Sequence, residues 1–296
     1  MTFLLQHISP APGPDALVVS AQDRGFLLGD GVFDTLVAVS GKPFALPAHV
    51  ERLVASADAI GIPLAADAVT AAIEAVLGSV AGRDAILRTT VTRGTAARGL
   101  WPAEPSQPTV AVSAQPWSRT LIGLPARLCV AVTPRNQRSP LSRLKSLAYL
   151  DNILAARQAS EESCDDALIL NLDGRVACST IANVFALRGT ALLTPPTTEG
   201  CLDGIVRRLV IEDAPMLGLT LVEAALSVPD LLAGDGCFLT NSVRLVRPVT
   251  AIGATALPSS PRFAALLDAL LARIHRETGV DIGRDEISPA FSRYLP

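Results

Sequence analysis

Lysine is rare in this chain, and one of its two lysines stands where an amine nucleophile could act. Lys and Arg together number 25, and only Lys42 and Lys145 are lysines. A primary amine can lose its proton and attack a carbonyl to form a Schiff base, whereas a guanidinium keeps its proton. Lys42 lies in the turn-like Ser-Gly-Lys-Pro, which predicts a solvated hairpin position. Lys145 is therefore the candidate nucleophile.

The element that must position Lys145 is predicted to be a helix. Leucines recur at helical spacing through "PLSRLKSLAYLDNILAARQASEE", residues 140–162. Tyr149 follows Lys145 by four residues, so on such a helix it lies one turn further along the same face.

Composition excludes several classes of protein. The chain has 296 residues, of which 49% are hydrophobic, and a net charge of -3. No Lys/Arg-rich run is present, so a nucleic-acid partner is not expected. The first residues lack the basic flank and long apolar run of a signal peptide, and no uncharged stretch is long enough to span a bilayer. These features predict a cytoplasmic protein with no membrane partner.

Cysteines and histidines form no recognisable metal or disulfide motif. The five cysteines are widely spaced without a CxxC pair, which argues against a zinc ribbon and a disulfide framework. The three histidines are far apart, so no metal site is predicted. A Ser-His-Asp triad stays open, although no Gly-x-Ser-x-Gly elbow supports one.

Hydrophobic periodicity predicts two domains. A small α+β domain covers 1–114, a Pro- and Gly-containing linker covers 115–125, and a larger α/β domain covers 126–296. The tail after Gly279 is polar and is expected to be loosely held. In the first domain we predict strands at 16–20, 33–39, 85–92 and 109–114, and helices at 47–62 and 66–80. In the second we predict strands at 126–133, 167–171, 174–179, 183–189, 191–195 and within 236–249, and helices at 140–162, 203–217, 228–234 and 261–277.

Seven segments, in order, resemble those of the class IV pyridoxal-phosphate enzymes. This family includes D-amino-acid and branched-chain aminotransferases and aminodeoxychorismate lyase. The resemblance implies a fold type IV enzyme: a small α+β domain and a larger β-barrel-like α/β domain that use pyridoxal 5'-phosphate. The segments are "DRGFLLGDGVFDTL" (23–36), "HVERLVASADAIGI" (49–62), "VTRGTAARG" (91–99), "RLKSLAYLDNILA" (143–155), "GRVACSTIANVFAL" (174–187), "GIVRRLV" (204–210) and "LTNSVRLVRPV" (239–249).

The resemblance implies a cofactor site around Lys145. This lysine matches the one that forms a Schiff base with the cofactor aldehyde and moves protons during the reaction. Arg52 in "HVERL" matches the arginine that binds the phosphate; the alternative is a solvated helix-surface arginine. The amides of Ile205 and Val206, at the start of a helix, match further phosphate donors.

Three more residues are implied at the cofactor. Asn241 and Ser242 match a second phosphate-binding turn, and the alternative is an ordinary polar turn. Tyr149 could reach the 3′ oxygen of the cofactor or could be a core tyrosine.

Cys178 departs from the family pattern. It stands where the resemblance implies a glutamate that keeps the pyridine nitrogen protonated and the ring a strong electron sink. A thiol is a weak hydrogen-bonding group and is mostly neutral at pH 7. Three outcomes stay open: another acid substitutes, the enzyme is slow or specialised, or the protein binds the cofactor without ordinary turnover.

Substrate residues are implied by three positions. Arg98 matches an arginine that grips the substrate carboxylate from a loop that reaches across a dimer interface; a solvated loop arginine is the alternative. Phe33 and Leu100 stand where D-amino-acid aminotransferases have Tyr and His, which argues against strict D-amino-acid specificity.

The function predicted is amino-group transfer between an amino acid or amine and a 2-oxo acid. The alternatives are aminodeoxychorismate lysis, which releases pyruvate and 4-aminobenzoate, and a non-catalytic or specialised cofactor-binding homologue. A homodimer is expected.

Overall fold

The computed structural model describes residues 2–7, 19–80, 82–96, 99–101 and 107–294, and it divides into two compact units. The first unit comprises residues 1–118 together with 144–148, and the second comprises 119–143 and 149–296. The short piece 144–148, which contains Lys145, thus belongs to the first unit although the second unit holds the chain on either side of it.

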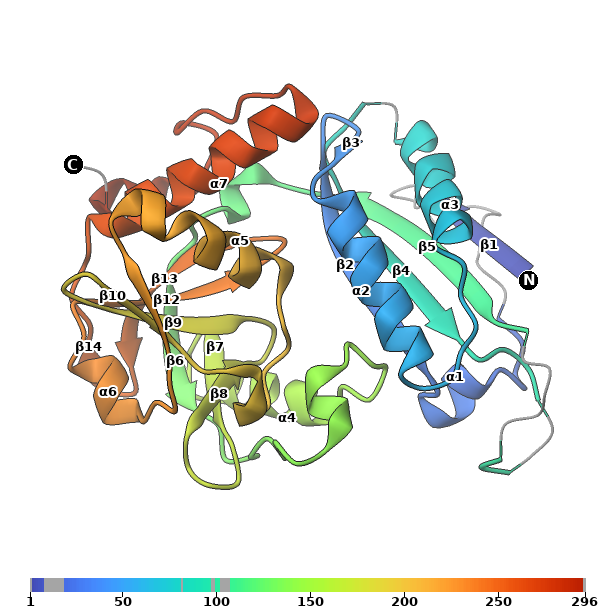
Figure 1. Ribbon diagram of the computed structural model, residues 1–296, viewed down its shortest axis with the longest axis horizontal. Helices are drawn as coiled ribbons and strands as arrows, with labels where there is room; N and C mark the ends of the chain where they lie inside the picture. Colours follow the sequence, from blue (N-terminus) through green and yellow to red (C-terminus); the bar gives the residue numbers. More distant parts are fainter. Residues whose placement is uncertain (1, 8–18, 81, 97–98, 102–106, 295–296) are drawn as a thin grey trace. The chain divides into compact units, whose positions relative to one another are not determined.

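The first unit is a five-stranded sheet in the order β1-β5-β4-β2-β3 (Figure 1). β1 pairs in parallel with β5, and the other neighbours are antiparallel. The strands are β1 (Thr2–His7), β2 (Gly31–Val39), β3 (Lys42–Pro43), β4 (Ala85–Thr92) and β5 (Thr109–Pro116), and the helices are α1 (Arg24–Leu28), α2 (Leu46–Asp58) and α3 (Ala66–Ser79).

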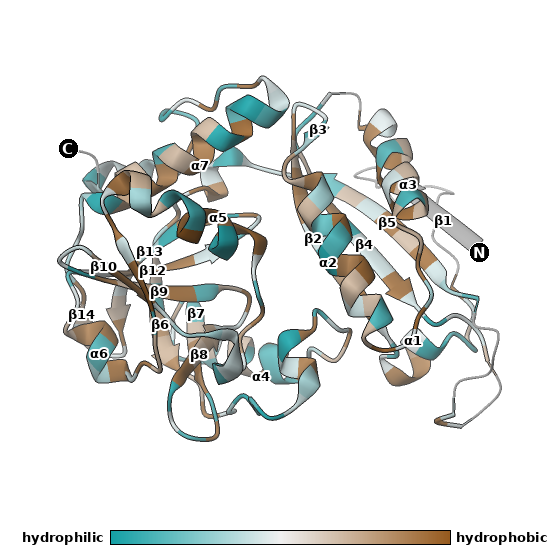
Figure 2. Cartoon of the chain, viewed as in Figure 1, coloured by the Kyte–Doolittle hydropathy of each residue, from teal (hydrophilic) through white to brown (hydrophobic). Residues whose placement is uncertain are grey.

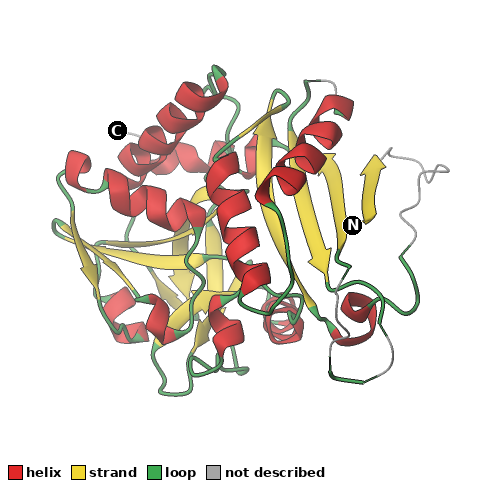
Figure 3. Cartoon of the chain, turned by 45° about the vertical axis from the view of Figure 1, so that its right-hand side comes forward, coloured by secondary structure: helices red, strands yellow, loops and turns green. Residues whose placement is uncertain are grey.

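Helices α2 and α3 pack on one face of this sheet (Figure 3). Alternate residues of β2, such as Val32 and Leu36, point toward the helices and join Val50 and Leu53 in the core. A proline at the first turn starts α2, and Gly61, in the left-handed conformation, follows its end. Phe33 and Thr35 of β2 point to the opposite face of the sheet, away from the helices.

The predicted helix across Lys145 is wrong. A 3₁₀-helix ends at Arg143, and α4 (Leu150–Glu161) begins after Tyr149, so the lysine lies in neither. Instead the Phe33 N–H donates to the Lys145 carbonyl at 2.8 Å, and the Leu147 N–H donates to the Gly31 carbonyl at 2.9 Å. These bonds add the segment to the edge of β2, and this tertiary pairing overrides the helical periodicity.

The second unit is built on a curled nine-stranded sheet in the order β11-β10-β9-β12-β13-β6-β7-β8, with β14 paired to β13. The strands are β6 (Ala126–Val130), β7 (Asp166–Leu170), β8 (Val176–Ser179), β9 (Asn183–Arg188), β10 (Ala191–Thr194), β11 (Thr220–Glu223), β12 (Gly236–Asn241), β13 (Leu245–Ile252) and β14 (Thr255–Ala256). Besides α4, the helices are α5 (Ile205–Asp213), α6 (Val228–Leu232) and α7 (Arg262–Thr278). The 3₁₀ turns are η1 (Arg119–Leu121), η2 (Pro140–Arg143), η3 (Thr197–Glu199), η4 (Pro215–Leu217) and η5 (Pro289–Tyr294).

Aromatic stacking joins α7 to this sheet. Phe185 of β9 and Phe238 of β12 are stacked with ring centres 5.0 Å apart, and Phe263 of α7 meets Phe238 edge-on at 5.6 Å. Apolar and polar residues alternate along α7, as its brown and teal patches show (Figure 2). The other face of the sheet packs with Leu231 of α6.

The tail after Gly279 is not loosely held, contrary to the sequence-based prediction. Phe291 is fully buried and fills the space beside Gly123, where an added Cβ would lie 2.6 Å from its ring. The Ser288 N–H donates to the Ile122 carbonyl at 3.0 Å. The few apolar residues of the tail, spaced among polar ones, are enough to hold it.

The predicted and the observed strands differ near the start of the chain. The prediction at 16–20 falls mostly on residues outside the described part of the chain, and the rest of it is not a strand. Strand β1 was not predicted at all. Within the described ranges, no helix is long and apolar enough to cross a membrane, and no cluster of three or more His, Cys, Asp or Glu could hold a metal ion.

Candidate active site

Lys145 lies against Phe33, on the face of β2 opposite the helices. The Lys145 Nζ atom is 4.2 Å from the centre of the Phe33 ring, and the guanidinium carbon of Arg88 is 3.7 Å from the same centre. Arg88 comes from the adjacent strand β4, where it pairs with Thr35. Cations are attracted to aromatic faces, so the buried ring orders both side chains. Two cations gathered on one ring form a local positive field that favours a carboxylate ligand.

Arg52 is held by a buried carboxylate. Its Nε and Nη2 atoms donate to Asp34 of β2 at 2.8 and 2.9 Å, and the ring nitrogen Nδ1 of His49 lies 2.7 Å from the same carboxylate. The Thr35 N–H also donates to it, at 2.6 Å. Within the described ranges the remaining nitrogen, Nη1, makes no hydrogen bond, so this edge of the guanidinium can bind an anion.

The charge balance at Asp34 explains its ionisation. Burial by itself raises the pKa of this carboxyl, but the Arg52 charge and the His49 contact outweigh burial. The pKa of Asp34 therefore ends well below its usual range, and the carboxylate is ionised at neutral pH.

Arg52 and Lys145 lie on opposite faces of the same strand. Successive side chains of a strand point to opposite sides. Lys145 contacts Phe33, whereas Arg52 contacts the next residue, Asp34, on the helix side. Arg52 is thus no solvated surface arginine, as one alternative held; it is 8% exposed.

In the second unit, the start of α5 presents free backbone amides. Gly204 precedes the helix, and no side chain caps it, so the N–H groups of Ile205 and Val206 are open to an anion. An added Cβ at Gly204 would lie 2.2 Å from the side-chain oxygen of Asn183, so glycine is required for this close approach. Asn183 in turn pairs with Thr240 between β9 and β12.

Strand β12 ends in a polar turn that includes the predicted Asn241 and Ser242. The side-chain oxygen of Asn241 accepts from the N–H groups of Val243 and Arg244 at 3.0 and 2.8 Å, which fixes the turn. The Thr240 hydroxyl is buried and has no hydrogen-bond partner among the described residues. A buried hydroxyl without a partner is costly, and a ligand oxygen would satisfy it.

Cys178 lies on β8 and contacts a cation. Arg135 Nη2 donates to its sulfur at 3.7 Å and to the Asn152 side-chain oxygen at 3.2 Å. Burial raises the pKa of the Cys178 thiol, and the Arg135 charge offsets only part of this effect, so the thiol is neutral at pH 7.

The remaining predicted residues have simpler surroundings. Leu100 is 80% exposed, and Arg24 donates to its carbonyl at 3.1 Å and to the Gly99 carbonyl at 2.8 Å. Arg98 lies outside the described residues. Tyr149 precedes α4, so its predicted place one helical turn after Lys145 is wrong, because no helix joins the two.

Four residues of these clusters were not singled out from the sequence. They are Asp34, Arg88, Arg135 and Thr240. Asp34 could have been found as an acid within a mostly apolar strand, and Arg88 as the one charged residue of the strand predicted at 85–92. No sequence signal distinguishes Arg135 from the arginines around it.

Solved structures with this architecture include aminotransferases and 4-amino-4-deoxychorismate lyases. The branched-chain aminotransferase of Thermoproteus uzoniensis with norvaline matches with a TM-score of 0.82 and 26% identity, over 90% of this chain and 94% of that one. A hypothetical aminotransferase of Mycobacterium tuberculosis in its PLP-bound form matches with a TM-score of 0.77 and 25% identity, over 88% of this chain and 95% of that one. The predicted fold class, a fold type IV enzyme with an α+β domain and a larger β-barrel-like α/β domain, is confirmed.

Residues 31–252 match the family model described as amino-transferase class IV, and the chain belongs to that family. A Methanocaldococcus jannaschii protein provisionally named a branched-chain-amino-acid aminotransferase is 36% identical over 78% of this chain and 81% of its own length. The aminodeoxychorismate lyase of Bacillus subtilis is 31% identical over 79% and 82%. The D-alanine aminotransferase of Bacillus licheniformis is 31% identical over 79% and 83%. The chain is therefore an enzyme of a family that depends on pyridoxal 5'-phosphate, and the predicted family is confirmed.

Proposed function

We propose that this enzyme is a pyridoxal-phosphate-dependent transaminase, which moves an amino group between an amino acid or amine and a 2-oxo acid. The observation that carries the proposal is Lys145, whose backbone is hydrogen-bonded to β2 and whose amine lies on the Phe33 ring. A fixed backbone orients the amine for covalent attachment of an aldehyde and for taking the proton from the substrate Cα.

Each unit carries groups that are chemically suited to bind the phosphate of the cofactor. Arg52 offers Nη1, which Asp34 leaves open, and Ile205 and Val206 offer backbone amides. The unpartnered hydroxyl of Thr240 adds a donor that needs an acceptor. When bound, the cofactor supplies an electron sink for the negative charge that develops at the substrate Cα.

Four further residues complete the proposed cofactor site. Asn241 and Ser242 form the second phosphate-binding turn, and Tyr149 contacts the 3′ oxygen. Cys178 lies at the pyridine nitrogen.

Phe33, Arg98 and Leu100 are proposed to bind the substrate, and Arg88 is added to them. The Arg88 cation, packed on Phe33 next to the nucleophile, supports a role for it in binding a substrate carboxylate. We further propose a cytoplasmic homodimer. Its substrates are an amino donor and a 2-oxo acid acceptor.

A second candidate reaction is aminodeoxychorismate lysis. The similarity to the Bacillus subtilis lyase favours it, because that relative matches this chain about as well as the D-alanine aminotransferase does. Both reactions begin with covalent exchange at Lys145 and loss of the Cα proton. Transamination leaves the amine on the cofactor, whereas the lyase releases pyruvate and 4-aminobenzoate.

The reaction is tested with a panel of amino donors. D- and L-amino acids and simple amines are offered with pyruvate or 2-oxoglutarate as acceptor, beside aminodeoxychorismate in a parallel assay. We expect amine transfer and the absorbance of the pyridoxamine form with at least one donor. Rapid release of 4-aminobenzoate, without that form from any donor, refutes the transaminase proposal in favour of the lyase.

The cofactor lysine is tested separately. Borohydride reduction of the loaded protein, followed by peptide mapping, should place the pyridoxyl group on Lys145. The chain's other lysine, Lys42, is an internal control, because it is exposed in a hairpin. An adduct on Lys42 alone contradicts the assignment.

A further inference from the structure

Arg135 is the charged group in contact with Cys178. Its Nη2 atom reaches the sulfur at 3.7 Å and the Asn152 oxygen at 3.2 Å. Its Nε atom is buried and has no partner among the described residues. No carboxylate of the described chain forms an ion pair with this guanidinium, so its charge is not neutralised locally.

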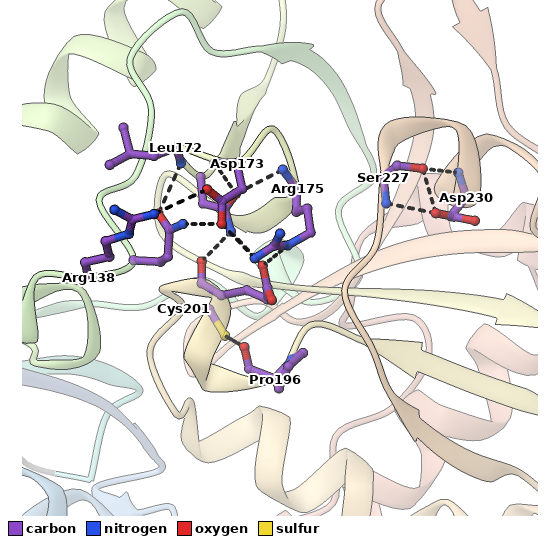
Figure 4. Close-up of polar contacts among 11 residues, drawn as sticks. Arg138, Leu172, Asp173, Arg175, Pro196, Cys201, Ser227 and Asp230 are labelled. Atoms are coloured by element: carbon purple, nitrogen blue, oxygen red, sulfur yellow. Dashed lines mark hydrogen bonds and ion pairs between the residues drawn. The ribbon is translucent and has the colours of Figure 1, made fainter.

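The segment that carries Arg135 is fixed in place. The Arg135 N–H donates to the Leu170 carbonyl at 2.8 Å, at the end of β7. Two residues further on, Gln137 donates to Asp173 at 2.9 Å and accepts from the Leu172 N–H at 3.1 Å. Figure 4 shows Leu172 and Asp173 of this network together with Arg175, which donates to Asp173 at 2.9 Å. The backbone at Arg135 is therefore held beside β7, and the bonds to Asn152 and Cys178 place the guanidinium at β8.

The acid that acts on Cys178, Asp166, does not compensate the cation. Asp166 of β7 acts on Cys178 electrostatically, but weakly compared with Arg135. Its oxygens accept from the Ser179 hydroxyl at 2.9 Å, from the Thr180 hydroxyl at 2.6 Å and from two backbone N–H groups. Arg247 lies 3.7 Å from the same carboxylate. An acid so fully engaged cannot also take the role of a glutamate at position 178.

Cys201, the other titratable group beside Cys178, brings no charge. Its thiol contacts the Pro196 carbonyl, as Figure 4 shows, and burial raises its pKa to about 12. Among the described residues, the neutral thiol of Cys178 is thus faced by one further neutral thiol, one saturated carboxylate and one uncompensated guanidinium.

We infer that Arg135 keeps the pyridine nitrogen of the bound cofactor unprotonated in this enzyme. The inference rests on the proposed function, which places that nitrogen at residue 178. A nearby cation disfavours a second positive charge, so the neutral ring is the favoured form. A neutral ring withdraws electrons less strongly than a protonated one. The proton transfer at the substrate Cα then depends more on Lys145 than it does in an enzyme with an acid at position 178.

The test reads the ring nitrogen directly. The protein is loaded with pyridoxal 5'-phosphate labelled with ¹⁵N, and its NMR shift is followed with pH beside the free cofactor. We expect the wild-type signal at the shift of the unprotonated free cofactor at pH 7. Cys178→Glu should move the signal to the protonated shift. Arg135→Gln should raise the pH at which the nitrogen becomes protonated.

Arg138→Gln is the matched control, because this arginine lies on the same segment and is 78% exposed. Its titration should match the wild type. A protonated ring in the wild-type protein overturns the inference, as does an Arg135→Gln titration that coincides with the control. Borohydride mapping on the same sample distinguishes failure of the proposed function from failure of the inference alone. With no adduct on Lys145, the proposed function falls and the inference with it; with an adduct and a protonated ring, the inference alone falls.

Discussion

Replacing Asp34 with asparagine should destabilise the first unit more than any loss of a surface ion pair. The Asp34 carboxylate is 4% exposed and accepts from Arg52, His49 and the Thr35 N–H. Asparagine keeps the shape but leaves the Arg52 cation buried without a counter-charge. Removing one partner of a buried ion pair costs about 3–5 kcal/mol, which corresponds to a fall in melting temperature on the order of 10 °C.

The pH dependence of this effect has a defined sign. The pKa of Asp34 in the folded protein lies well below the value of about 4 of an unfolded chain. The stability that its charge contributes is therefore fully present above that unfolded value and is lost as the pH falls through the folded pKa. The difference between wild type and Asp34→Asn should be constant from pH 7 to pH 5 and should shrink below pH 4.

Tryptophan fluorescence during urea unfolding is the suitable assay. Both tryptophans of the chain, Trp101 and Trp117, belong to the first unit, and Trp117 is buried. The control is Glu51→Gln, which changes an exposed side chain of the same unit and should cost about 0.5 kcal/mol or less. If Asp34→Asn loses no more than about 1 kcal/mol relative to this control, the carboxylate is not the group that holds Arg52.

Three further predictions concern ligand binding. Arg52→Ala should weaken equilibrium binding of pyridoxal 5'-phosphate to folded protein by roughly 10- to 100-fold, which is the value of a charge-assisted hydrogen bond. Glu51→Ala, the control, should leave this affinity unchanged. Equal cofactor affinities in the two variants exclude the phosphate role of Arg52. Arg88→Gln should raise the KM for carboxylate substrates by roughly tenfold or more. Arg83→Gln, an exposed change in the same unit, should leave the KM unchanged. Similar KM values in both variants argue against a role of Arg88 in binding the substrate carboxylate. Thr240→Val should leave the stability of the cofactor-free protein unchanged or higher, because the hydroxyl has no partner among the described residues. The same change should weaken cofactor binding several-fold. Unaltered cofactor binding shows that the hydroxyl faces no ligand.

Periodicity and motifs in the sequence already located much of the fold. The strand predicted at 85–92 coincides with β4, and the helix predicted at 66–80 differs from α3 by one residue. These elements bury one face against a continuous core, and a repeated burial pattern is what periodicity records. The glycine-led start of α5 was likewise readable, because helix starts have local signatures.

The sequence by itself also determined the family and the candidate nucleophile. Seven ordered segments identified the family, and the contrast between two lysines and many arginines singled out Lys145. Both conclusions depend on residue type and order along the chain, which no folding event changes.

Only the tertiary structure decided the surroundings of the reactive groups. Lys145 leaves its expected helix because the free edge of β2, more than a hundred residues earlier in the chain, offers backbone hydrogen-bond partners. Asp34 meets Arg52, and Arg135 meets Cys178, through the packing of elements whose order along the chain does not fix their contacts. Local periodicity records which face of an element is buried; which charged side chains then share that face depends on how distant segments pair and pack.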